Sequence, residues 1–210
     1  MVLINSIRIL RERKKEYYIV LSLIFLILFV HSFFIGQNLY IKDREKAEIF
    51  LKKISESTKV RFIIDLFRRG KYVTAGSMIF MNNFIIAAIA VYSGIIFFIP
   101  LFILFSNAVI TGILFGIESI ASGTLSLFHL FFIILVGLLE ISSLIISTYE
   151  GVRIGIGIIK PNISSKERLN KFKQGLYEAT LMLSFVVVLL FIAAIIETTG
   201  IVIFNLKFVK

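Results

Sequence analysis

Glu140 is a single carboxylate in a long apolar stretch and the residue of this chain best placed to do chemistry. Ser119–Leu139 before it and Ile141–Tyr149 after it contain no Asp, Glu, Lys or Arg. A charged side chain in hydrocarbon costs at least about 2.5 kcal/mol, so it needs a partner, a water-filled cavity or a neutral state. We expect Glu140 to be buried, largely neutral at pH 7 and hydrogen-bonded to another helix. We favour a structural hydrogen-bond anchor, with a proton or cation site as the alternative.

Three asparagines, Asn82, Asn83 and Asn107, lie in other apolar stretches and are candidate partners for this carboxyl group. An amide in lipid usually hydrogen-bonds across a helix interface, for about 0.6–2 kcal/mol. We predict an intramembrane polar network made of Asn82, Asn83, Asn107, His129, Glu140, Arg153 and Glu197.

The two histidines do not predict a metal site. His129 is about three helical turns from Glu140, so the two side chains cannot touch within one helix. We expect His129 to be a polar residue at the membrane boundary, and His31 stands alone in another apolar stretch. Glu150 and Arg153 are at positions i and i+3 at an expected membrane edge, and we expect them to form an ion pair.

Small residues at helical spacing predict close contacts between helices. Gly112–Gly116 and Gly151–Gly155 have the GxxxG spacing that lets two backbones approach. No Ser-His-Asp arrangement, paired carboxylate site, nucleotide loop or cofactor fingerprint is found in the sequence. We therefore expect no catalytic residues, no cofactor and no enzymatic activity.

The elements that must position these residues are transmembrane helices. Tyr72–Ile117 carries no charged residue, and as one helix it would be about 69 Å long, more than twice the roughly 30 Å hydrocarbon core. It should therefore fold back, and Pro100 is the expected turn because proline lacks an N–H. The shortest span is expected after Pro100, with little tilt or a partly re-entrant path. The five spans are expected at Tyr17–Gly36, Met78–Ile99, Leu101–Ile117, Ser126–Tyr149 and Leu176–Ile196.

Composition supports a polytopic membrane protein. The chain is 58% hydrophobic, above the roughly 45–50% of soluble domains, and it contains no cysteine, which excludes disulfides and thiolate metal sites. We expect the first apolar stretch to be a retained span and not a cleaved signal, because it is long and lacks a cleavage pattern. We divide the chain into a basic segment at 1–16, a first transmembrane helix at 17–36, a polar, partly amphipathic helical connection at 37–77, and a bundle of four further helices at 78–206 with a basic loop at 150–175.

The connection between the first two spans has two helical patterns. Asp43–Ile54 reads as a charged helix, and Val60–Phe67 places its apolar residues on one helical face. The second helix is expected to lie against the membrane or the bundle. In the later basic loop, Pro161 and Asn162 predict a turn.

The net charge of +10 points to anionic lipid headgroups as partners and not to nucleic acid, for which no motif is present. Lys and Arg are almost evenly divided between the two expected sides, so the charge rule does not orient the chain. The basic cluster before the first span favours a cytoplasmic N-terminus.

Several motifs resemble the stage II sporulation protein M family. "MIFMNNFIIA" around Asn82 and Asn83, the glycine that follows at Gly94, and "SNAVITGILFG" match two of its spans, with Ala108 in place of a glycine. "VGLLEISS" and "YEGVRIGIG" match its best marker, with Val136 in place of a histidine. "IAAIIETTG" with Glu197 resembles its last span. The glycines that match the family are predicted to lie at helix packing contacts: Gly94, Gly112, Gly116, Gly137, Gly151 and Gly155.

The resemblance implies five helices, a cytoplasmic N-terminus, and the family's role of placing partner enzymes at a membrane. We predict an all-α integral membrane protein of the cell membrane. It would act as a non-enzymatic scaffold or membrane-remodelling component that recruits membrane or cell-envelope proteins. The alternative is a transporter or channel that uses Glu140 and the intramembrane asparagines as a proton or cation site. An intramembrane hydrolase is a distant third.

Overall fold

The computed structural model describes residues 2–121, 127–159 and 164–204, and the side chains of 2–121, 131–159 and 164–203. Every regular element in these ranges is a helix. The elements are α1 (Val2–Glu12), α2 (Lys15–Lys42), α3 (Arg44–Ser55), α4 (Thr58–Arg68), α5 (Tyr72–Tyr92), the 3-10 turn η1 (Ser93–Ile95), α6 (Phe98–Ala121), α7 (Leu127–Ile159) and α8 (Ser165–Phe204).

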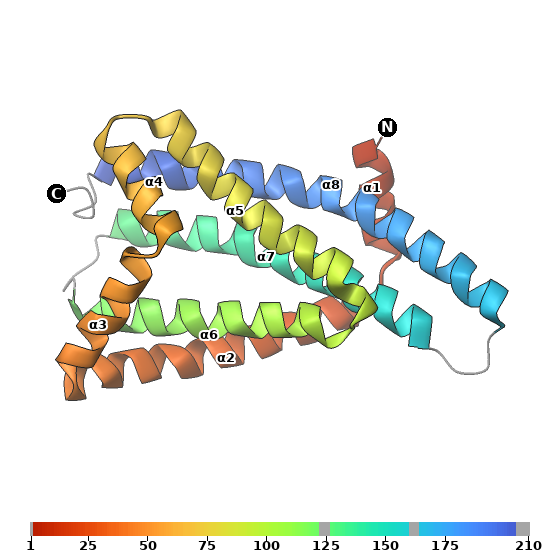
Figure 1. Cartoon of the computed structure of the whole chain (residues 1–210), viewed down its shortest axis with the longest axis horizontal. Coiled ribbons are helices and arrows are strands. Elements are labelled where there is room, and N and C mark those ends of the chain that lie inside the picture. The colour runs from red at the N-terminus through yellow and green to blue at the C-terminus, as the bar shows by residue number, and fades with distance from the viewer. Residues whose placement is uncertain (1, 122–126, 160–163, 205–210) are drawn as a thin grey trace.

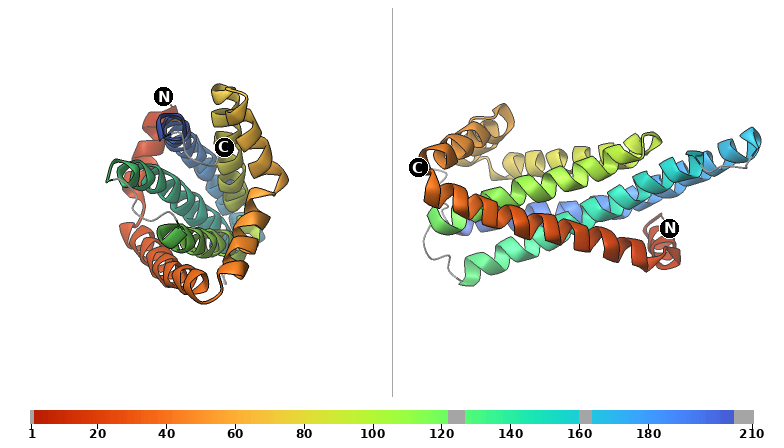
Figure 2. Two further views of the ribbon diagram at one scale, coloured as in Figure 1. Left: turned by 90° about the vertical axis from the view of Figure 1, so that its left-hand side faces the viewer. Right: turned by 90° about the horizontal axis from the view of Figure 1, so that it is seen from below.

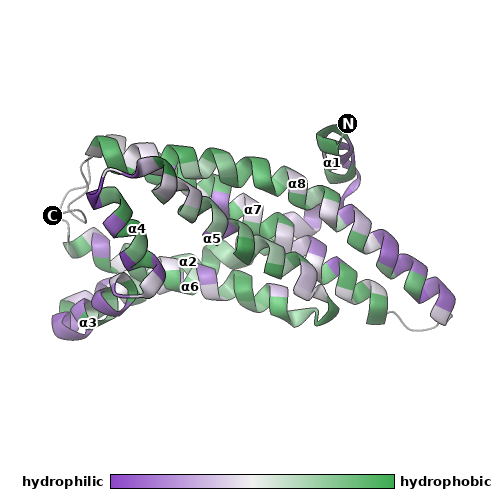
Figure 3. Cartoon of the chain, turned by 45° about the horizontal axis from the view of Figure 1, so that its top comes forward, coloured by the Kyte–Doolittle hydropathy of each residue, from purple (hydrophilic) through white to green (hydrophobic). Residues whose placement is uncertain are grey.

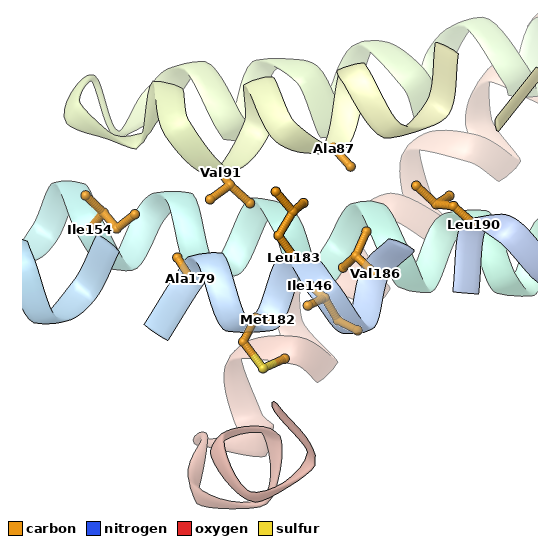
Figure 4. Packing of buried hydrophobic residues seen from close by; sticks show 9 residues of the cluster. All are labelled: Ala87, Val91, Ile146, Ile154, Ala179, Met182, Leu183, Val186 and Leu190. Carbon is orange, nitrogen blue, oxygen red and sulfur yellow. The ribbon is translucent and has the colours of Figure 1, made fainter. Parts of the chain in front are cut away.

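Five helices are long and apolar enough to cross a membrane: α2, α5 with η1, α6, α7 and α8. The predicted class, an all-α polytopic membrane protein, is therefore confirmed. α2 packs mainly on α6, and α8 packs on α7 and α5, so the spans form two connected groups that run roughly side by side (Figure 1). A cluster of buried apolar residues fills the space between α5, α7 and α8 (Figure 4).

The two ends of the bundle carry different elements. α1, the turn η1 and the start of α8 lie at one end, which we call the α1 end (Figure 1). α3 and α4 lie at the other, the α3–α4 end, where they connect α2 to α5 across the bundle (Figure 2). Apolar residues cover the middle of the bundle, and hydrophilic residues gather on α3 and on the first turns of α8 (Figure 3).

The turn between the second and third spans lies earlier than predicted. The expectation that Pro100 forms it is wrong: the turn runs through η1, and Pro100 is buried in the first turn of α6. A proline is tolerated there because the first N–H groups of a helix have no partner within the helix. With this start, α6 has 24 residues against 21 in α5, so the third span is not short.

The predicted basic loop at 150–175 is mostly helical, and this expectation is corrected. α7 continues to Ile159 and α8 begins at Ser165, while the predicted turn at Pro161 and Asn162 lies outside the described residues. The 40 residues of α8 reach about 60 Å, about twice the thickness of the hydrocarbon. Its first turns therefore extend beyond the bundle.

The two helical patterns between the first spans are present as α3 and α4. The side chain of Asp43 accepts a hydrogen bond from the backbone N–H of Lys46 and caps α3. Hydrogen bonds from the Lys46 side chain and backbone lower the pKa of this carboxyl group. α4 packs on α5 and buries Leu66 and Phe67, whereas Phe62 remains 47% exposed to the surroundings of the protein.

Candidate functional site

The predicted intramembrane network separates into two clusters in the structure. The first, which we call the carboxylate cluster, contains Asn82, Asn83, Glu140 and Glu197. Asn83 on α5 donates a hydrogen bond from its side chain to the Glu140 carboxyl group on α7, and Asn82 donates to the side-chain oxygen of Asn83 at 3.3 Å. The expected hydrogen bond from Glu140 to another helix is thus present, with Asn83 as donor. The side chain of Glu140 is half-buried, so the expectation that it is fully buried is not met.

Glu197 on α8 completes this cluster. It lies close enough to Glu140 for the two carboxyl groups to repel each other when both are ionised. The neighbouring Thr198 hydroxyl is buried without a hydrogen-bond partner among the described residues and lies beside Gly76 of α5. Two neighbouring carboxyl groups in a membrane can bind a proton or attract a cation, which is the chemistry that this cluster makes available.

Two other predicted members do not belong to the carboxylate cluster. Asn107 donates its side-chain hydrogen bond at 2.9 Å to the carbonyl oxygen of Ile103 on its own helix. The expected bond across helices is therefore wrong for this asparagine, because the preceding turn of its own helix offers a nearer acceptor. The side chain of His129 lies outside the described residues.

Arg153 belongs to a second cluster near the α1 end, which we call the ion cluster: Arg13, Glu150, Arg153 and Glu178. Glu150 is completely buried. Its carboxylate accepts from Arg13 Nε at 2.8 Å and pairs with Arg153 Nη2 at 2.8 Å. Glu178 Oε2 receives Arg13 Nη2 at 2.8 Å and Arg153 Nη1 at 3.0 Å. Two arginines and two glutamates therefore neutralise one another.

Arg13 connects the start of the chain to this cluster. It lies between α1 and α2, and its partners Glu150 and Glu178 lie on α7 and α8. Burial acts to lower the pKa of the Arg13 guanidinium, but hydrogen bonds and charge attraction from the two glutamates outweigh it and raise the pKa. Arg13 therefore remains charged at every physiological pH.

Tyr18 and Tyr149 lie near the charged groups of the ion cluster. The rings of Tyr18 and Tyr149 are 4.5 Å apart between centroids, and the Tyr18 hydroxyl is buried without a partner among the described residues. Arg13, Arg153 and Glu178 remain partly exposed, so the attraction is strengthened most at the fully buried Glu150, where the local dielectric is lowest.

The Glu150–Arg153 pair was expected from its i, i+3 spacing, whereas Arg13 and Glu178 were missed. Arg13 is one of several basic residues before the first span, and nothing in the spacing distinguishes it from Arg11 or Lys14. Glu178 is an isolated acidic residue at the start of an apolar run. That position was an available signal for an intramembrane partner.

Glycine positions set the distances between the helices that carry both clusters. A Cβ atom on Gly94 would collide with the carbonyl oxygen of Gly151, and one on Gly155 with the carbonyl oxygen of Gly94. Gly112 and Gly116 make the equivalent contacts with the backbone of α2 at Phe29 and Phe33. These five predicted packing glycines therefore lie at close helix contacts.

Gly137 is the exception, and its predicted packing role is wrong. A Cβ atom added there would meet nothing within 4 Å. The close approach of other backbones to α7 occurs at Gly151 and Gly155, and helices that cross at an angle separate away from the crossing point. Gly36, which lies against the Ile113 backbone, was not singled out.

The described residues contain no group of three or more His, Cys, Asp or Glu side chains that could hold a metal ion. The architecture and the two clusters define a polytopic helical membrane protein with a packed interior and a few paired polar groups. The family model described as Stage II sporulation protein M matches residues 18–200. The chain belongs to the stage II sporulation protein M family. Comparisons with curated proteins and with solved structures found no match.

Proposed function

We propose that this chain is a non-enzymatic membrane scaffold that recruits partner proteins through helices held outside the membrane. The feature that supports this function most directly is the exposed surface of α3. Among the described residues, the main contacts of this helix are with the neighbouring elements α2 and α4, and Ala47 is its one buried residue. Phe50, Leu51 and Ile54 are half-buried, whereas the charged side chains of α3 are all exposed and available to a partner.

The surface of α3 combines charge with an apolar side chain. Lys and Arg outnumber Asp and Glu over residues 42–71, and Ile49 is 57% exposed among them. A partner with an acidic surface and a small apolar contact would fit this helix, because opposite charges steer association and an apolar centre adds affinity.

The packed interior is the second support. Glycine contacts bring α2 against α6 and α7 against η1 with backbone touching backbone. Such helices hold their exposed ends at a constant spacing, which is what a scaffold requires. We also propose that the α1 end faces the cytoplasm and the α3–α4 end faces outward, as the family resemblance implies.

Site-specific crosslinking tests recruitment by α3. A photoreactive residue at Ile49 should crosslink a protein partner in living cells, whereas one at Ile27, a 66% exposed residue of the apolar helix α2, should contact lipid. The double variant Lys52→Glu/Lys53→Glu should abolish the Ile49 crosslink while helix content and thermal stability stay unchanged. Identical products from Ile49 and Ile27, or a crosslink that survives charge reversal, would contradict the proposal.

The carboxylate cluster supports one alternative, a proton- or cation-coupled transporter. Glu140 and Glu197 are brought together from α7 and α8 at a depth where carboxyl groups are otherwise rare. Under the scaffold proposal, Glu140→Gln keeps the shape of the side chain and leaves partner crosslinking intact. If purified protein in vesicles carries a proton or cation flux that Glu140→Gln abolishes without loss of folding, the transporter is the better description.

A further inference from the structure

The first helix, α1, lies across the bundle instead of along it (Figure 1). Ser6 in its middle is completely buried and donates a hydrogen bond from its hydroxyl to the Leu181 carbonyl oxygen of α8 at 2.7 Å. Ile9 and Leu10 pack against the buried cluster between α5, α7 and α8, and Met182 of that cluster points toward α1 (Figure 4). α1 is therefore held in place by one face.

α1 has more apolar surface than this contact uses. Leu3 is 43%, Ile4 67% and Ile7 38% exposed. Leu3 and Ile7 are one turn apart, so they share a side of the helix. Arg8 and Arg11, in the second half of α1, are exposed as well. An amphipathic helix with both kinds of exposed surface is typical of a helix in the plane of a membrane interface.

The depth of α1 agrees with such an interface. Tyr17, Tyr92 and Tyr177 are exposed at the α1 end, and exposed tyrosines mark the boundary between hydrocarbon and headgroups. The contact of Ser6 is with Leu181, about one helical turn or 6 Å further into the bundle than Tyr177. Interfacial helices bury their apolar side about 5–10 Å into this boundary.

The charges at this end select the kind of lipid. Arg13 is paired with Glu150 and Glu178 and is not available for headgroups. The exposed charges around it are basic in the majority: Arg8, Arg11, Lys14 and Lys15 against Glu12 and Glu16. Exposed basic residues close to the membrane surface attract anionic headgroups.

We propose that α1 is an interfacial anchor that inserts Leu3 and Ile7 at the hydrocarbon boundary and binds anionic phospholipid headgroups through Arg8 and Arg11. This surface is at the opposite end of the bundle from α3. It does not depend on the recruitment of a protein partner.

The absence of tryptophan from the chain allows a direct test with a single introduced fluorophore. Leu3→Trp reports on the side expected in lipid, and Glu12→Trp is the matched control, because at about 100° per residue it points away from Leu3. In vesicles of the full chain with brominated acyl chains, Leu3→Trp fluorescence should be quenched and that of Glu12→Trp largely preserved. Equal quenching at both positions, or none at Leu3→Trp, would overturn the proposed insertion.

The lipid preference is tested in the same vesicles. Brominated phosphatidylglycerol should quench Leu3→Trp at several-fold lower mole fraction than brominated phosphatidylcholine, with each arginine contributing up to about fivefold. Arg8→Gln/Arg11→Gln should remove the preference, and Lys52→Gln/Lys53→Gln at the other end should preserve it. Equal quenching by the two brominated lipids, or an equal loss of the lipid preference in both double variants, would overturn anionic lipid binding by α1.

Discussion

At the scale of single residues, the ion cluster and the carboxylate cluster compensate charge in different ways. Glu150 is completely buried but contacts two arginines, so its negative charge is compensated by direct ion pairs. Glu140 has an amide partner and a second carboxyl group nearby, and no basic partner of Glu140 is found among the described residues. The first arrangement stabilises ionised side chains, whereas a carboxyl group in a membrane with no basic partner favours its neutral form.

Loss of the Glu150 carboxylate should strongly destabilise the protein. Glu150→Gln leaves Arg13 and Arg153 to share Glu178 alone, and breaking a buried ion pair costs about 3–5 kcal/mol. Unfolding by denaturant in detergent micelles measures the change. Glu48→Gln is the matched control, because its pair with Arg44 is exposed and should contribute about 0–1 kcal/mol. Equal effects of the two substitutions would show that the ion cluster does not hold α7 and α8 to the chain start.

Substitutions at Glu140 should separate hydrogen bonding from charge. Glu140→Leu leaves the Asn83 amide without its acceptor, which should cost about 1–3 kcal/mol, whereas Glu140→Gln keeps an acceptor oxygen and should be nearly neutral. The same unfolding measurement distinguishes them. A stable Glu140→Leu would contradict an anchoring role for this residue.

At the scale of elements, backbone contacts at glycines decide how closely the helices approach. Gly151 and Gly155 on α7 receive the end of α5 and the turn η1. This contact fixes the α1 end, where α7 also presents Glu150 and Arg153. We therefore expect the ion cluster to depend on these glycines.

Two glycines on α7 provide a matched test of this idea. A Cβ at Gly151 would collide with the Ala90 carbonyl oxygen and lie 2.8 Å from Pro100 Cγ, so Gly151→Ala should cost about 1–3 kcal/mol. Gly137→Ala meets open space and should be neutral or stabilise by up to about 1 kcal/mol through helix propensity. Thermal unfolding of the two variants gives the comparison. A Gly151→Ala variant as stable as Gly137→Ala would mean that α5 and η1 do not press on α7.

At the scale of the whole molecule, the two ends of the bundle are distinct surfaces. α1 and the first turns of α8 share one end, and α3 and α4 occupy the other (Figure 1). α1 and the first turns of α8 therefore lie on the same side of the membrane. Residues 43–71 lie on the opposite side. The basic residues are spread over both ends, which explains why charge counting gives no orientation.

Single cysteines should reveal this arrangement, because the native chain has none. Ser57 and Ser165 are exposed at opposite ends, and their substitution by cysteine is conservative. An impermeant maleimide added to intact cells should label Ser57→Cys, and Ser165→Cys should react only after permeabilisation. The reverse pattern would invert the proposed orientation, and labelling of both in intact cells would contradict the fold.

The sequence by itself determined the class of protein. A chain can cross the hydrocarbon core only as long apolar helices, and such segments are recognised from amino-acid composition alone. It also indicated α4, the packing glycines at Gly151 and Gly155, and a hydrogen-bonded Glu140. Each of these depends on spacing within one helix or on the cost of a polar group in lipid.

The tertiary structure alone decided which polar residues meet. Arg13 joined Glu150 and Glu178 across more than a hundred residues of sequence, Asn107 turned to its own helix, and Gly137 met no neighbour. Pro100 began a helix instead of ending one. These outcomes depend on where separate helices cross. Helical periodicity fixes the direction in which a side chain leaves its own helix, but it does not determine which other helix lies in that direction.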